Sequence, residues 1–345
     1  MGAMSDESDG RNVVARGLLV TAAIGLWALA VVPPVRANTA QDVRPPAVAQ
    51  ETPTEPLEVA ASGALVEEGF FDDARERLAE AFRLDDFYAY RERRTELNTN
   101  PLGRLGTGDV KLYEVYPSPT RGLTYRRLIA TNDEPTSAAD RARQDRDYHE
   151  RTADIRRRLA EETAERRQGT PEDRAEAESR RAERLERSRE RARRQIDDVI
   201  NAMQFNVERR DVFEGRPSIV VTFGPRPGAD PQTRRGDLAR KFAGTAWIDE
   251  AEREVRYVEA TSIDSISFGL GLAARISDGA AATMRREKVA DGVWMLTSMT
   301  LTGSGRAVLF LRGLSIDYSV EWFDYRPAGE VPIPGAPEDT LDASD

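Results

Sequence analysis

The stretch Gly244–Ala260, with the sequence GTAWIDEAEREVRYVEA, decides the fold of this chain. Apolar and β-branched residues flank a charged centre, a pattern that predicts a strand, a tight turn and a returning strand. Trp247 precedes the carboxylates Asp249, Glu250 and Glu252. The backbone of a turn is solvated, and paired catalytic carboxylates need environments that separate their pKa values. We therefore expect Trp247 to anchor the hairpin and the carboxylates to form its solvated tip.

The same hairpin signal recurs along the second half of the chain. Turns are predicted at Glu214-Gly215 and at Asp291-Gly292, because such pairs tolerate the backbone of a two-residue hairpin turn. A last turn is expected near Gly303-Ser304-Gly305. In residues 314–322 apolar and polar side chains alternate, so one face of that strand is expected to be buried and the other solvated.

A helix and further strands are predicted nearer the N-terminus. Residues 64–84 place apolar side chains mostly three and four positions apart, which indicates an amphipathic helix. Residues 87–97 and 108–133 are rich in aromatic and β-branched residues, with a turn at Pro117–Gly122. Successive hairpins with one buried face favour a curved antiparallel sheet. We therefore expect an α+β fold in which the helix lies across the concave side of the sheet.

Residues 137–203 interrupt the β pattern with Arg, Glu, Asp and Ala and almost no large apolar residue. At residues 168–173 Gly169 suits a helix end, Thr170 an N-cap and Pro171 the first helical position. Two long helices are predicted, folded into a helical hairpin or extended from the body. A sustained heptad of apolar residues is missing, so i,i+4 ion pairs rather than a stable coiled coil are expected to support them.

The N-terminus has the pattern of a secretory signal peptide. Arg11 and Arg16 precede an apolar run at 17–32, which is shorter than the ~20 residues that a spanning helix needs. Val35 and Ala37 are small enough for a cleavage site after residue 37. We expect a periplasmic protein that is not integral to the membrane after cleavage; an uncleaved membrane anchor is the alternative.

These patterns divide the chain into six segments. The linker and the tail hold few apolar residues, so neither is expected to order itself. The expected order is signal peptide (1–37), disordered Pro-rich linker (38–62), helix and first strands (63–136), charged helical hairpin insertion (137–203), remaining strands (204–327) and acidic disordered tail (328–345).

The composition argues against several classes of chemistry. The chain has no cysteine and one histidine, His149, which lies among charged residues and is expected to be solvated on a helix. A disulfide, a thiolate nucleophile, a His-dependent triad and a multi-histidine metal site are therefore not expected. The net charge is −10 and acids balance the Arg-rich insertion, so nucleic acid is not an expected partner. Without a phosphate loop or nucleophile elbow, we expect no enzyme, cofactor or metal.

Some strands carry apolar residues on both faces. Val293 and Met295 alternate with Trp294 and Leu296, and residues 308–311 repeat the arrangement. Successive side chains of a strand point to opposite faces, so one pair is expected in the core and the other in a cleft. Ordinary core on both faces is the alternative. The candidate residues for a hydrophobic ligand are Phe82, Trp247, Phe268, Leu270, Leu272, Trp294, Leu296, Leu309 and Leu311.

Four segments together carry a resemblance to a known family: Gly244–Ala260, the loop at 268–274, VADGVWMLTSMTLTGSGRAVLFLRG (289–313) and DYSVEWFDYR (317–326). With the N-terminal YAYRERR, YEVYP and YRRLIATNDEP, they resemble uncharacterised exported members of the outer-membrane lipoprotein-sorting superfamily, the LolA/LolB-like proteins and the related stress sensor RseB. The resemblance covers roughly residues 64–132 and 205–326. It implies an unclosed β-barrel with a helical lid and an apolar cavity for acyl chains. The long insertion, the acidic tail and the lack of a LolB-type acylation cysteine depart from that family.

Two functions follow as hypotheses. The first is a periplasmic protein that binds a lipid or an acylated protein in the cleft of a half-barrel, which includes outer-membrane lipoprotein sorting. The second is a non-carrier interaction or sensor module, in which the helices of residues 137–203 contact an envelope protein partner. Export, two-faced strands and the resemblance favour the first, and the charged insertion favours the second.

Overall fold

The computed structural model describes residues 66–67, 69–96, 107–120, 122–168, 170–268, 274–307 and 312–335. The predicted signal peptide, the Pro-rich linker and residues 336–345 lie outside this range. The helices are α2 (Phe70–Leu84), α3 (Ala138–Gln168), α4 (Pro171–Ala202) and α5 (Arg234–Ala239), with 3-10 turns η2 (Asp85–Phe87) and η3 (Ala328–Glu330). The strands are β1 (Tyr88–Thr95), β2 (Val110–Tyr116), β3 (Tyr125–Thr131), β4 (Glu134–Pro135), β5 (Met203–Phe213), β6 (Arg216–Pro225), β7 (Phe242–Asp249), β8 (Val255–Ser262), β9 (Ile266–Phe268), β10 (Ala274–Ile276), β11 (Ala281–Ala290), β12 (Val293–Ala307) and β13 (Arg312–Pro327).

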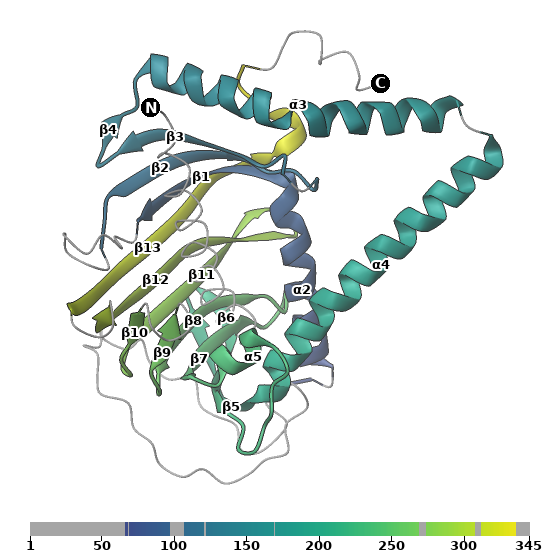
Figure 1. The fold of residues 1–345 in the computed structure, drawn as a ribbon. Helices are drawn as coiled ribbons and strands as arrows, with labels where there is room; N and C mark the ends of the chain where they lie inside the picture. The colour runs from purple at the N-terminus through teal and green to yellow at the C-terminus, as the bar shows by residue number, and fades with distance from the viewer. Residues whose placement is uncertain are drawn as a thin grey trace.

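The strands form one curved antiparallel sheet that does not close into a barrel (Figure 1). Its order is β4-β3-β2-β1-β13-β12-β11-β8-β7-β6-β5, with β9 and β10 attached beside β12. The N-terminal strand β1 therefore pairs with the C-terminal strand β13, and the sheet ends at β4 and β5. The expected α+β class and the curved antiparallel sheet are confirmed.

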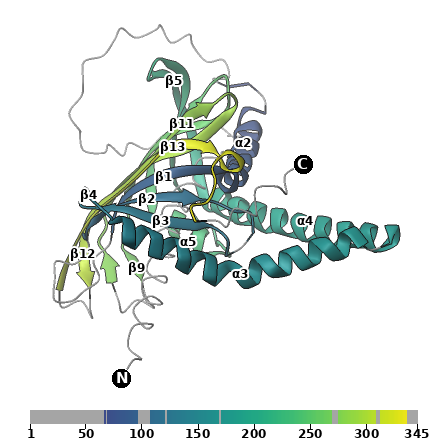
Figure 2. The ribbon, with the colours of Figure 1, turned by 90° about the horizontal axis from the view of Figure 1, so that it is seen from above.

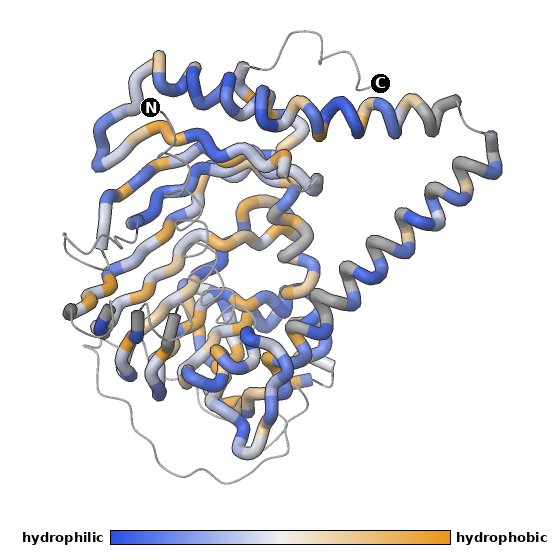
Figure 3. The backbone as a smooth tube through the Cα atoms, in the orientation of Figure 1, coloured by the Kyte–Doolittle hydropathy of each residue, from blue (hydrophilic) through white to orange (hydrophobic). Residues whose placement is uncertain are grey.

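Helix α2 lies across the concave face, as its apolar periodicity predicts (Figure 2). It buries Phe70, Phe71, Ala74, Leu78 and Ala81 in a core cluster that also contains apolar residues of β5 to β13. In Figure 3 the orange of hydrophobic residues is concentrated on the strands, and the blue of hydrophilic residues runs along α3 and α4. The sheet and α2 therefore form the hydrophobic body.

The turn signals are correct at two places and wrong at a third. Gly215 and Gly292 have φ of 75° and 68°, and each lies in the turn of a two-stranded hairpin. The turn expected at Gly303-Ser304-Gly305 does not occur there, because β12 continues through these residues to Ala307. A Cβ on Gly305 would lie 2.1 Å from the carbonyl oxygen of Arg275 in β10. The glycine therefore permits close approach of a strand rather than a turn.

Gly244, the first residue of the opening motif, has the same role between β7 and β8. A Cβ at this position would lie 1.9 Å from the carbonyl oxygen of Glu259 on the neighbouring strand. Glycine is needed here for space, because the backbones approach closely within the sheet.

Helices α3 and α4 project from the body and meet near Thr170, which places the predicted interruption at the corner of a V-shaped arm (Figure 1). They diverge from this corner instead of packing side by side. Each is about 47 Å long at 1.5 Å per residue. Exposed i,i+4 pairs such as Arg180–Glu176 at 3.1 Å lie along the arm. No helix in the described ranges is both long and apolar enough to cross a membrane.

The base of α3 is attached to β3, on the part of that strand that the two-residue edge strand β4 leaves unpaired. Gln144 accepts from the amide of Leu128 at 2.8 Å and donates to its carbonyl at 3.2 Å, so the side chain pairs with the open edge of the sheet. Asp145 accepts from the Tyr125 hydroxyl at 2.6 Å and from Arg127 at 2.8 Å. Tyr148 stacks on Tyr125 at 4.2 Å.

The segment after β13 corrects two expectations. Val331 and Ile333 pack against the tyrosine cluster at the base of α3, so residues 328–335 are not a disordered tail. His149 is half-buried, and its Nε2 donates to the carbonyl oxygen of Pro334 at 2.9 Å. The histidine therefore holds the C-terminal segment instead of being simply solvated. Sequence periodicity gave no signal for this contact, because it joins residues far apart in the chain.

The base of α4 belongs to the core. Ile196, Val199 and Ile200 are buried in the main cluster. Asp198 accepts from the backbone amides of Gln232 and Thr233, each at 2.8 Å, which fixes the start of α5. The arm is thus attached to the body at both of its ends.

Candidate ligand-binding face

The concave face of the sheet is apolar across its central strands. Alternating residues of β6, β7, β8, β12 and β13 face the same side, since a strand turns every second side chain to one face. The buried residues on this face include Ile219, Val221, Ala246, Ile248, Val258, Met299, Leu301, Ile316, Tyr318 and Val320. The face therefore forms a continuous hydrophobic surface over which α2 is placed.

Helix α2 is held over this surface by two kinds of contact. Its apolar side is buried, with Leu78 at 0 % and Phe70 at 2 % exposure. At the rim, Arg253 pairs with Glu67 at 2.8 Å, and Arg75 pairs with Asp197 of α4. Exposed pairs of this kind contribute about 0–1 kcal/mol each. The burial of apolar area therefore holds the helix in place, and the rim contacts orient it.

The carboxylates of the opening motif are not a solvated tip. Asp249 is 1 % exposed and accepts from Arg216 Nε at 2.6 Å and from the backbone amides of Ala251 and Glu252 at 3.1 and 2.8 Å. Glu250 is half-buried and pairs with Arg210 at 2.8 Å. A buried carboxylate is stable only when it is paired and hydrogen-bonded, and Asp249 meets this condition. Its role is to close the turn between β7 and β8.

Two further carboxylates connect this turn to the next hairpin. Glu252 accepts from the indole Nε1 of Trp294 at 2.6 Å and from Arg216 at 2.8 Å. Glu254 is 6 % exposed and accepts from Arg286 at 2.6 Å. Arg286 also donates to the carbonyl oxygen of Trp294 at 2.9 Å. The hairpin ends of β7–β8 and β11–β12 are thus joined by the buried Arg286–Glu254 ion pair and the Trp294–Glu252 hydrogen bond, which the sequence did not predict.

We expect these contacts to make stability sensitive to acid. Burial alone would raise the pKa of Asp249, but the hydrogen bonds from Arg216 and two backbone amides outweigh it and hold the pKa below its usual value. A lowered folded pKa contributes stability that is present above the unfolded pKa, about 4, and is lost as the pH falls below it. Urea melts between about pH 6 and pH 3 should show this loss, and D249N should be less stable at neutral pH with a flatter acid dependence. An unchanged acid slope in D249N would contradict the assignment.

Trp247 lies on the convex face, opposite the core residues Ala246 and Ile248. Its ring contacts Phe213 at 5.6 Å and Tyr257 at 5.5 Å between centroids. Strand alternation requires this placement, because Trp247 separates two residues of the concave face. The expectation that it lines the cleft with the other candidates is therefore corrected, whereas its position within the hairpin is as predicted.

The two pairs on β12 do not divide into core and cleft. Trp294 and Met295, one from each pair, are 3 % and 1 % exposed, while Val293 and Leu296 are half-buried. Leu296 packs against the concave core. For Phe82 and Phe268 the structure gives only the backbone, at the end of α2 and in β9. Leu270, Leu272, Leu309 and Leu311 lie outside the described residues.

A polar region of the concave face was missed by sequence reasoning. We call it the polar wall and define it as Glu92, Arg94, Glu96, Lys111, Tyr113 and Arg126. Glu92 and Arg94 lie in register opposite Trp322 and Val320 of β13, which belong to the apolar face or pack against it. Charged residues alternating on a strand look like a solvated face, so only the pairing partners reveal that these point inward.

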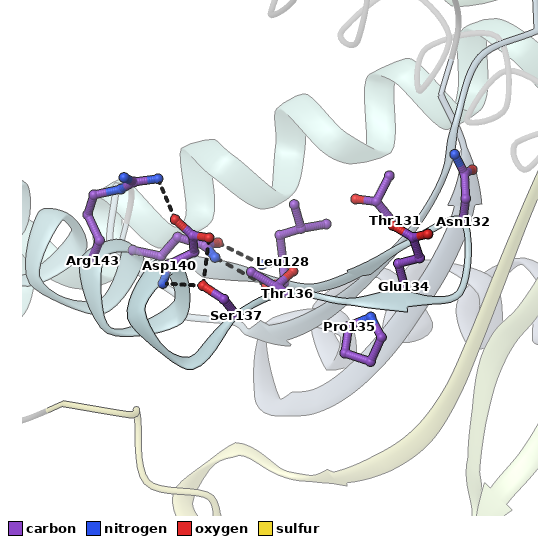
Figure 4. Close-up of a pocket in the computed structure, with 10 residues that line it drawn as sticks. Leu128, Thr131, Asn132, Glu134, Pro135, Thr136, Ser137, Asp140 and Arg143 are labelled. Carbon is purple, nitrogen blue, oxygen red and sulfur yellow. Dashed lines mark hydrogen bonds and ion pairs between the residues drawn. The ribbon is translucent and has the colours of Figure 1, made fainter.

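The sheet edge and the convex face carry surface pockets. One of about 800 Å³ lies between β3, β4 and the start of α3, and Figure 4 shows Ser137, Asp140 and Arg143 on its helical side. Ser137 accepts from the amide of Asp140 at 3.0 Å and so caps the helix, and Arg143 pairs with Asp140 at 2.8 Å. A convex pocket of about 690 Å³ includes Arg285 and Phe323. Within the described residues, no group of three or more His, Asp or Glu is placed to hold a metal ion.

No family model matches the chain, and no curated protein matches it. Among solved structures, a crystal structure described as an outer membrane lipoprotein-sorting protein domain from Vibrio parahaemolyticus is similar, with a TM-score of 0.30 and 11 % identity. The similarity covers 78 % of this chain and 94 % of that domain.

Proposed function

We propose that this protein binds the acyl part of a lipid or of an acylated protein on the concave face of its half-barrel. The observation that carries the proposal is an unclosed sheet with a continuous apolar concave face, covered by an amphipathic helix that is attached to it mainly through apolar contacts. In this proposal α2 is a lid. The signal-like sequence at residues 11–37 supports a periplasmic location.

The energies of lid and ligand are comparable. Burying Phe70, Phe71 and Leu78 stabilises the closed lid by about 1.5–3 kcal/mol for each side chain. An acyl chain gains about 0.8 kcal/mol for each buried CH₂ group. A chain of about a dozen carbons, which gains about 10 kcal/mol, can therefore offset displacement of the lid, whereas a chain of half that length gains about 5 kcal/mol and offsets only the lower end of the cost. Binding should consequently depend strongly on chain length.

A tethered lid tests the proposal. The chain has no cysteine, so R75C/D197C introduces a unique pair of thiols across α2 and α4 that a short bismaleimide can join. We expect the unmodified double variant to take up a fluorescent long-chain fatty acid, palmitate to displace it, and octanoate not to. Cross-linking should abolish uptake. The two single-cysteine variants treated with the same reagent are the controls.

Uptake that persists after complete cross-linking would show that α2 is not the lid. No uptake by the untethered protein, together with no lipid in its extract by mass spectrometry, would reject the carrier function itself.

A second function is favoured by the arm. Helices α3 and α4 are fixed at their bases by Gln144, Asp145 and Ile196, while the rest of the arm projects from the body (Figure 1). Its acidic and basic residues nearly balance, which suits contact with a polyampholytic protein surface better than with nucleic acid. We propose an envelope protein as the partner in this alternative.

Removal of the outer arm separates the two functions. Residues 157–187 are replaced by a flexible Gly/Ser linker, so that the bases of both helices remain. If the arm binds a partner, chemical cross-linking should no longer recover partner proteins with the shortened variant, while its fatty-acid uptake should be unchanged. Retention of every partner would reject the interaction function.

A further inference from the structure

The concave face changes from apolar to charged at β1. Glu92 faces the same side as Trp322, and Arg94 the same side as Val320, because each pair is in register across β1 and β13. On the next strand, Tyr113 and Lys111 are in register with Glu92 and Arg94. The polar wall therefore continues the surface on which α2 and the core cluster lie.

The polar wall is an organised network rather than a row of solvated charges. Arg94 is 8 % exposed and donates to Glu96 Oε1 at 3.0 Å, and Glu92 accepts from Arg126. Tyr113 donates its hydroxyl to Glu96 at 3.1 Å, and the guanidinium groups of Arg94 and Arg126 each lie over its ring, 5.3 and 5.0 Å from the centroid. These contacts fix both arginines in place.

Tyr318 joins the network to the apolar core. Its side chain belongs to the main core cluster, and burial raises the pKa of its phenol to about 12. Tyr318 lies two residues before Val320 on the same face of β13, and Val320 is in register with Arg94 of the wall. The apolar surface and the charged network therefore meet at one residue.

A buried ionic network contributes less to stability than apolar packing of the same volume, so its place beside an apolar face calls for a use other than stability. The polar wall contains three cations, Arg94, Lys111 and Arg126, and two carboxylates, Glu92 and Glu96. It therefore carries one excess positive charge. Lys111 is half-buried, and it forms no ion pair with any side chain in the described part of the chain. One cation on this face is thus free to accept an anion.

We infer that the polar wall binds the anionic head of the amphiphile whose chain occupies the concave face, with Lys111 and the partly exposed Arg126 as its direct contacts. This inference rests on the proposed acyl-chain function and names its substrate class, a long-chain amphiphile with a carboxylate or phosphate head. Glu92 and Tyr113 position Arg126. Charge-assisted hydrogen bonds from both cations to the head would neutralise the excess charge.

Competition against a neutral probe tests the inference. N-phenyl-1-naphthylamine reports occupancy of the apolar face, and laurate, dodecyl phosphate and monolaurin are titrated against it at mildly alkaline pH. We expect an anionic competitor to displace the probe at about tenfold lower concentration than neutral monolaurin, mainly through the charge-assisted contact from Lys111, because Arg126 is already paired with Glu92. The relative potency of laurate and dodecyl phosphate distinguishes the two heads. Inorganic phosphate alone should not displace the probe.

Variants locate the effect. K111M breaks no ion pair and should reduce the preference for anions to about twofold, with monolaurin unchanged and the melting temperature preserved. K111M/R126M should remove the preference, whereas R209M/R210M, which removes the same charge from β5, should retain it.

Equal potency of charged and neutral competitors in the unmodified protein would overturn the head-group inference and leave the acyl-chain function standing. Failure of all three competitors and of the probe to bind would overturn both. An anion preference that K111M and K111M/R126M leave intact would also overturn the inference.

Discussion

Replacing Arg286 by methionine should lower the free energy of unfolding by about 3–5 kcal/mol, because it leaves a buried carboxylate without its cation. Arg286 is 1 % exposed and lies 2.6 Å from Glu254, which is itself 6 % exposed. The same guanidinium donates to the Trp294 carbonyl, which would also lose its partner. Urea denaturation followed by circular dichroism measures the change.

Two controls make this result specific. K288M removes a cation two residues further along β11, where the side chain is 34 % exposed, and should cost about 1 kcal/mol or less. In the R286M/E254M double variant, apolar side chains replace both charges, so much of the lost stability should return. A cost below about 1 kcal/mol for R286M would show that the pair does not hold β8 to β11.

Truncating Trp294 to alanine should cost about 3–5 kcal/mol, since it removes a large buried side chain and the site cannot fully collapse. The indole is 3 % exposed, lies beneath the Arg216 guanidinium at 5.6 Å and donates to Glu252 at 2.6 Å. W294F keeps most of the packing but loses the hydrogen bond to a charged acceptor, so it should cost about 1.5–3 kcal/mol.

The neighbouring Val293 provides the comparison for Trp294. Val293 is half-buried, so V293A should cost less than either substitution of Trp294. The thermal melts are followed by circular dichroism, because the substitutions of Trp294 change the tryptophan fluorescence of the protein. If W294A and V293A were equally mild, Trp294 would be a surface-lining residue, as the sequence-based ligand hypothesis requires, and not part of the hairpin core.

The strand pattern illustrates what local sequence can predict. The alternation in residues 314–322 and the turn at Asp291-Gly292 depend on steric rules that act over a few residues, and both appear in the structure. The same rules fail at Gly303 and Gly305. Glycine permits both a turn and a close backbone contact, and only the position of β10 decides between them.

For the candidate site, the local sequence predicted less than the tertiary structure decided. The sequence indicated an apolar face, but it assigned Trp247 to that face when strand alternation and pairing turn it to the convex side. In the sequence Asp249 looks like a turn residue and Glu254 like the start of the returning strand, since their cations, Arg216 and Arg286, are about 30 positions away. Ionic pairing across hairpins depends on register, which a local pattern does not contain.

The sequence by itself determined the elements: the amphipathic helix, the hairpins, the long charged helices and their break near Thr170. These follow from side-chain periodicity, turn stereochemistry and capping, which are local properties. Only the tertiary structure decided that β1 pairs with β13, which turns Glu92 and Arg94 toward the apolar face. Burial and ion pairing depend on which distant strands lie side by side, and for that reason the polar wall emerged only from the fold.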